Sequence, residues 1–148
     1  KGNPYAQYRL GMLYLKGEEF SPQVEVAMKW LQQAAEQKNE WAFYQLGKLY
    51  LSGEHVTKNV ETAVHYLGLC AEKGNQYAQY VLGKLYLCGR DVSRDREKAV
   101  EYLTASAEKG NLYASFLLVS GSNQTASSSG KAVLRRSTET NGNEAVSD

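Results

Sequence analysis

The chain has 148 residues, and its 17 lysines and arginines nearly balance its 16 aspartates and glutamates, which leaves a formal net charge of +1. This balance argues against a protein that binds nucleic acid directly through clustered cations. No apolar run approaches the roughly 18–20 residues that a membrane-spanning helix needs, and no signal-peptide pattern is visible, so we expect no membrane association.

The first helical pattern covers residues 4–15. Apolar residues recur there at Ala6, Leu10, Leu13 and Tyr14. Their steps of 4, 3 and 1 place them on one stripe of a helix with about 3.6 residues per turn. Gly17 follows, and a residue without Cβ suits the left-handed backbone that ends many helices. The sequence therefore predicts a helix that stops at this glycine.

A second helix is predicted after a short linker. Its apolar stripe consists of Ala27, Leu31, Ala34 and Ala35. Ser21 is a plausible N-cap for this helix, and Thr57 and Ser93 are its equivalents further along the chain. Asn59 and Asp95 lie two residues after those equivalents and compete for the same role, so both choices stay open.

A tight turn is predicted after each second helix. Gly74 and Gly110 occupy the helix stop in two of these turns, and an asparagine follows each of them as the cap of the next helix. The first such turn has Lys38 at the glycine position. We therefore expect a positive φ at Lys38, at some cost in strain.

These elements repeat with a period of 36 residues. Positions that match without insertion include Ala6/Ala42/Ala78, Leu10/Leu46/Leu82, Gly11/Gly47/Gly83, Leu13/Leu49/Leu85, Tyr14/Tyr50/Tyr86, Gly17/Gly53/Gly89, Ala27/Ala63/Ala99 and Leu31/Leu67/Leu103. The units cover about 3–38, 39–74 and 75–110, with a partial unit at 111–120. Composition then shifts to Gly, Ser, Asn, Gln and Thr, and we predict a flexible Ser/Gly-rich tail at 121–148.

The repeated pattern of Ala6, Leu10, Gly11, Leu13, Tyr14 and Gly17, followed by Ala27, Trp30, Leu31, Ala34, Ala35 and Glu36, resembles the Sel1-like repeat, a relative of the tetratricopeptide repeat. A stacked 36-residue helix-turn-helix unit predicts an all-α fold, a right-handed α-solenoid in which each unit buries its neighbour's face. Residues 1–3 match the closing turn at 109–111, and the last unit has no second helix. We therefore expect a fragment of a longer bacterial array.

No constellation of residues indicates catalysis or a bound cofactor. His55 and His65 are the two histidines, and no cysteine or carboxylate lies at ligand spacing from either of them, so we expect no metal site. No phosphate-binding glycine loop and no nucleophile elbow is present. Cys70 and Cys88 are expected to lie too far apart for a disulfide, and two free thiols favour a reducing, cytoplasmic setting.

A second face of each first helix carries aromatic and basic residues. In the related tetratricopeptide arrays this face lines a concave groove, and the resemblance implies that the same positions bind a partner here. They are Tyr5, Tyr8, Arg9, Met12, Trp41, Tyr44, Gln45, Lys48, Tyr77, Tyr80 and Lys84. Aromatic residues and arginine are common among binding hot spots. Tyr5, Trp41 and Tyr77 could instead pack between units, whereas Tyr8, Tyr44 and Tyr80 are expected to be exposed.

The resemblance implies a non-catalytic scaffold or adaptor for protein–protein interaction, which binds a partner segment in its concave groove. An alternative is the accessory repeat region of a larger DNA-mobilisation enzyme of the relaxase type, whose catalytic domain would lie outside this sequence. A stand-alone hydrolase is least favoured, although a fold alone does not decide activity. Uncovered apolar faces at the two ends of the array further predict self-association.

Overall fold

The computed structural model describes residues 2–17 and 23–125, and within these ranges it contains seven helices and no strand. The helices are α1 (Pro4–Lys16), α2 (Val24–Glu36), α3 (Glu40–Ser52), α4 (Val60–Glu72), α5 (Gln76–Cys88), α6 (Arg96–Glu108) and α7 (Leu112–Thr125). The predicted all-α repeat fold is confirmed.

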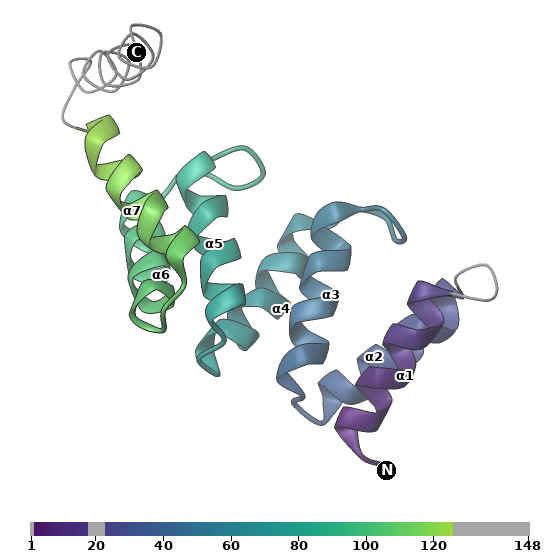
Figure 1. Ribbon diagram of the computed structural model, residues 1–148. Coiled ribbons are helices and arrows are strands. Elements are labelled where there is room, and N and C mark those ends of the chain that lie inside the picture. The colour runs from purple at the N-terminus through teal and green to yellow at the C-terminus, as the bar shows by residue number, and fades with distance from the viewer. Residues whose placement is uncertain (1, 18–22, 126–148) are drawn as a thin grey trace, which may run out of the picture.

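The helices form an open arc of antiparallel pairs, with α1 at one end and α7 at the other (Figure 1). Within a unit, α1 packs on α2, α3 on α4, and α5 on α6. The second helix of each unit then packs on the first helix of the next, and α7 also contacts α5. Because α4 packs against both of them, α3 and α5 make few direct contacts with each other.

A glycine on each first helix sets the distance between the two helices of a unit. A Cβ at Gly47 would lie 2.6 Å from Leu67 Cγ, much closer than two carbon atoms normally approach. The same close approach recurs at Gly11 with Leu31 and at Gly83 with Leu103. The leucine of each pair is almost completely buried. Gly47 therefore lies at the contact between the two helices of its unit.

In the turn between two units, the same few residues end one helix and begin the next. Lys38 has φ +61°, which confirms the positive φ expected at the one turn without glycine. Its N–H donates to Ala35 O, and the N–H of Asn39 donates to Ala34 O, the pair of bonds that typically closes a helix in this way. The side chain of Asn39 then accepts from Ala42 N and caps α3. One asparagine therefore closes one helix and opens the next.

The structure decides between the two sets of N-cap candidates. The side chain of Asn59 accepts from Thr62 N, and that of Asp95 accepts from Lys98 N, so these residues cap α4 and α6 in place of Thr57 and Ser93. The backbone explains the choice, because the N–H of each cap also donates to the tyrosine carbonyl near the end of the preceding helix. Ser21 lies outside the described residues, and Gln23 precedes α2 without a side-chain cap.

Two features depart from the repeat at the ends of the array. Leu13 is 61% exposed, whereas its equivalent Leu49 is 5% exposed, because no described helix covers the outer side of α1 as α2 covers α3. At the other end, α7 runs to Thr125, past the boundary predicted at residue 120. Residues 126–148, the rest of the predicted tail, lie outside the described residues.

Candidate functional site

The predicted binding residues lie on the first helices, and their burial differs from what we expected. Tyr77 is 48% exposed, and Tyr5 is exposed as well. Tyr8 and Tyr44, which we expected to be exposed, are partly buried and pack against the core. Tyr80 is also partly buried. The exposure expected for Tyr8, Tyr44 and Tyr80 was therefore wrong, and of the three residues left open, Trp41 is partly buried while Tyr5 and Tyr77 are exposed.

The surroundings of each ring account for this result, since Trp41 and Tyr77 occupy the same position on their helices but only Trp41 is partly buried. Tyr77 lies in the first turn of α5, and its ring stays about half exposed. Tyr44 lies one turn further into α3, close enough to Cys70 and Tyr77 to interact electrostatically with both. Burial is the main cause of the raised pKa of the Tyr44 phenol, and Cys70 and Tyr77 add smaller contributions.

The aromatic residues form separate clusters instead of one continuous ladder. Ring centroids lie 6.3 Å apart for Trp41 and Tyr77 and 6.2 Å apart for Tyr44 and Tyr77, so three rings join two units. Tyr5 and Tyr8 form their own pair at 6.1 Å on α1. In the part of the chain that the structure describes, no ring contact joins this pair to α3.

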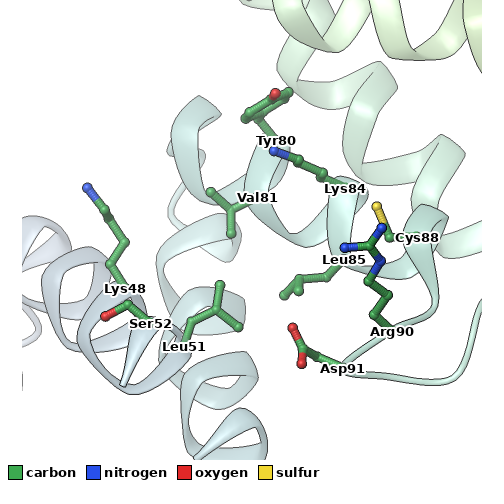
Figure 2. A pocket seen from close by; sticks show the side chains of 10 residues that line it. All are labelled: Lys48, Leu51, Ser52, Tyr80, Val81, Lys84, Leu85, Cys88, Arg90 and Asp91. Atoms are coloured by element: carbon green, nitrogen blue, oxygen red, sulfur yellow. The ribbon is translucent and has the colours of Figure 1, made fainter. Parts of the chain in front are cut away.

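A groove of about 390 Å³ opens between α3 and α5, beside the linker that follows α5. The lining residues are Lys48, Leu51, Ser52, Tyr80, Val81, Lys84, Leu85, Cys88, Arg90 and Asp91. Figure 2 shows Leu51, Val81 and Leu85 pointing into the space between the two helices. These side chains give the groove an aliphatic floor, since α3 and α5 are not packed closely enough to cover them.

The rim of the groove is cationic. Lys48 stands on the α3 side, and Lys84 and Arg90 stand on the α5 side (Figure 2). Neither Lys84 nor Arg90 forms an ion pair with a described carboxylate. Lys48 Nζ lies 5.2 Å from the centre of the Tyr44 ring, a cation–π distance. The three cations are thus exposed and free to meet an anionic group.

Asp91, the acidic residue in the lining of the groove, forms an ion pair with a lysine. Asp91 Oδ1 lies 2.9 Å from Lys58 Nζ, and this ion pair joins the linkers of two neighbouring units. Both side chains are partly exposed, so the pair contributes no more than a modest amount to stability. Its effect at the groove is to cancel the charge of Asp91, which leaves the cations of the rim in excess.

The groove brings together only part of the predicted set. Lys48, Tyr80 and Lys84 line it, whereas the remaining predicted residues lie outside its lining. Sequence reasoning also missed Ser52, Leu85, Cys88, Arg90 and Asp91. Leu85 shares the position of Leu13 and Leu49 on the apolar stripe, and the other four lie at or beyond the end of a helix, where periodicity is least informative. Gly89 ends α5 with a left-handed backbone. The linker folds back from that point, with Asp95 N–H donating to Tyr86 O, and a glycine stop followed by charged residues could have indicated this.

Other candidate chemistry gives no site in the described residues. His55 and His65 are exposed. Within residues 2–17 and 23–125, no group of three or more side chains could hold a metal ion. Both cysteines are free; Cys70 is buried, which raises the pKa of its thiol to about 12, and Cys88 is exposed at the groove. No described helix is long and apolar enough to cross a membrane.

The family model of the Sel1 repeat matches the chain three times, at residues 4–39, 42–75 and 76–111. These matches coincide with the three complete helix pairs. No curated protein matches the sequence in a comparison of whole chains.

Three solved structures are similar to the chain. A protective antigen present in uropathogenic Escherichia coli strains, which displays an SLR fold, is 32% identical over 75% of this chain, with a TM-score of 0.70. A Sel1 repeat protein from Oxalobacter formigenes is 37% identical over 76% of this chain, with a TM-score of 0.69. The cysteine rich protein B of Helicobacter pylori is 19% identical over 78% of this chain, with a TM-score of 0.59, and shows similarity of fold alone.

The chain spans 24% of the length of the first of these proteins and 46% of the second, against 97% of the third. Similarity to the first two therefore concerns the repeat units that they share with this chain, and not the whole of either protein.

Proposed function

This chain belongs to the Sel1 repeat family, and from that premise we propose that it is a non-catalytic scaffold that holds a protein segment in the groove between α3 and α5. Sel1 repeats commonly mediate protein–protein interactions, and proteins built from them are generally non-catalytic scaffolds. The groove is the feature of the described residues that best fits such a role.

The observation that carries the proposal is an aliphatic floor beside unpaired cations. Leu51, Val81 and Leu85 are only partly buried, although the fully buried leucines of the same helices show that the fold can cover aliphatic residues completely. Binding hot spots commonly combine an apolar anchor in a pocket with a polar rim that excludes water. A partner's aliphatic side chain would cover this floor and gain the free energy of burial.

The repeat itself supplies substitutions that test the groove with little risk to the fold. Val81 has Gln45 as its equivalent one unit earlier, so Val81→Gln replaces a floor residue with one that the same position already accommodates. We would select peptides from a random display library against the full chain and measure their affinity for the parent and for Val81→Gln. We expect an affinity loss of about tenfold or more, as for truncation of a hot-spot side chain.

The matched control is Lys29→Ala, an exposed position on α2 away from the groove. It should leave the affinity of every selected peptide unchanged. Unaltered binding of all selected peptides to a folded Val81→Gln variant would place recognition elsewhere on the molecule and overturn the proposal. The alternative function, an accessory region of a DNA-mobilisation enzyme, stays a prediction because no observation on the described residues favours it.

A further inference from the structure

The groove carries more positive charge than the fold requires, and we infer that its partner is an acidic segment with an aliphatic anchor. This inference rests on the proposed function and adds the chemistry of the partner. In such a segment, an aliphatic side chain would enter between Leu51, Val81 and Leu85, and carboxylates beside it would meet the cations of the rim.

Comparison of equivalent positions shows that packing does not require these charges, although Lys48 and Lys84 occupy the same position in successive units. Thirty-six residues before Lys48 stands Met12, and thirty-six residues before Arg90 stands Glu54. Both positions therefore accept a neutral or acidic residue in another unit of the same fold. Cations that packing does not require, placed around an uncovered apolar floor, point to a ligand that is itself anionic.

The arrangement of the cations also restricts the partner. Lys48 stands on one side of the aliphatic floor, and Lys84 and Arg90 stand on the other (Figure 2). A segment lying across the groove therefore passes positive charge both before and after its anchor residue. Acidic residues flanking one aliphatic residue fit this arrangement better than an acidic run alone, which would leave the floor uncovered.

A protein segment fits the groove better than a nucleic acid does. Single-stranded nucleic acids bind through stacking of bases on aromatic side chains and through many phosphate contacts. Tyr80 is the one aromatic residue in the lining of this groove, and it already contacts Tyr113 at 6.1 Å between ring centroids. Three cations and a net charge of +1 for the whole chain offer few phosphate contacts.

The test uses three probes, each labelled with fluorescein. The first is a decapeptide in which leucine and isoleucine are flanked on both sides by glutamate and aspartate. The second has every acid replaced by its amide, and the third is a ten-nucleotide oligothymidine. Fluorescence anisotropy with the full chain should give an affinity for the acidic peptide about tenfold or more above that for the amide peptide, and the difference should shrink as salt is added.

Two substitutions test whether the cations of the rim cause the preference for the acidic peptide over the amide peptide. Lys48→Met and Arg90→Glu introduce the equivalent residues of the preceding unit and should together remove most of the preference for the acidic peptide. Lys29→Ala, at an exposed position on α2, should retain the full preference. Circular dichroism during thermal unfolding checks that each variant keeps the helical fold.

The outcomes separate this inference from the proposed function. Equal affinity for the acidic and amide peptides, or stronger binding of the oligothymidine than of the acidic peptide, overturns the inference. If library-selected peptides still lose affinity on Val81→Gln, the groove remains a protein-binding site of different chemistry. An acid preference that survives the Lys48→Met and Arg90→Glu double substitution also overturns the inference, because the cations of this rim would not be its cause.

Discussion

At the scale of single residues, two glycines in one unit have opposite roles. Gly47 faces Leu67 across the contact between α3 and α4, where a Cβ would lie 2.6 Å from Leu67 Cγ. Gly68 lies within α4, and a Cβ there would meet no heavy atom within 4 Å. The first glycine is required by packing. The second only lowers the helix propensity of its segment.

The two glycines should therefore respond oppositely to alanine. Gly47→Ala is expected to destabilise the fold by about 1–3 kcal/mol, because Leu67 must move or the helices must separate. Gly68→Ala should stabilise it by about 0.5–1 kcal/mol through helix propensity. Urea unfolding followed by circular dichroism measures both. A Gly47→Ala variant at least as stable as the parent chain would contradict the helix contact described for this unit.

Lys38 offers a second prediction at this scale. It has φ +61°, a conformation in which a side chain with a Cβ is strained, so Lys38→Gly should raise the free energy of unfolding by up to about 1 kcal/mol. The greater freedom of glycine in the unfolded chain reduces the gain.

Lys73 provides the control for Lys38, because it lies at the end of α4 with φ −75°. Glycine relieves no strain at that position, so Lys73→Gly should not stabilise the chain. The midpoint of urea unfolding, compared among the parent and both variants, checks the pair. Equal gains from both substitutions would show that strain at residue 38 is not the cause.

At the scale of helices, the order and pairing of elements could be predicted from the sequence, but some of their ends could not. Periodicity places the stripe of each helix, because burial of that stripe drives its packing. The start of α6 depends on the linker, where Ser93 and Asp95 are both good cap residues. Only the folded linker, in which Asp95 N–H reaches Tyr86 O, selects Asp95.

The choice of cap gives the prediction at this scale. Asp95→Ala removes the carboxylate that accepts from Lys98 N at 3.1 Å, and should cost about 1 kcal/mol of stability. Ser93 is exposed and caps no described helix, so Ser93→Ala should change stability by less than about 0.5 kcal/mol. Thermal unfolding of the two variants compares them directly, and an equal loss from both would mean that the helix start is assigned wrongly.

The groove was only partly predictable for a related reason. Angular position on a helix identifies the outward face, and it placed Lys48, Tyr80 and Lys84 there. The burial of each side chain depends on the distance to neighbouring helices, and the sequence of a single helix does not determine that distance. Tyr44 is partly buried and Tyr77 exposed for this reason. Arg90 reaches the groove from a linker, where no periodicity indicates a direction.

At the scale of the whole molecule, the two ends of the array expose apolar residues. Leu13 is exposed on α1, and Leu112, Phe116 and Val119 are exposed on α7. In the interior of the array, neighbouring helices bury Leu49 and partly bury Leu85, the residues equivalent to Leu13. Exposed apolar patches of this kind favour association between molecules.

We therefore expect the 148-residue chain to self-associate as its concentration rises. Sedimentation equilibrium over a wide concentration range measures this, and the double substitution of Leu13→Glu and Phe116→Glu should shift the chain toward the monomer. Val100→Glu is the control, since Val100 is exposed on α6 within the array. A purely monomeric parent chain at every concentration would contradict the expectation.

The shared asparagines have a mechanical consequence. Since Asn39, Asn75 and Asn111 each close one helix and cap the next, no slack backbone separates one pair of helices from its neighbour. Tension applied along the array cannot be taken up by unfolded linkers between units. The tension must instead be distributed over the packed contacts between helices, each of which shifts slightly. We therefore expect the array to stretch elastically as a whole.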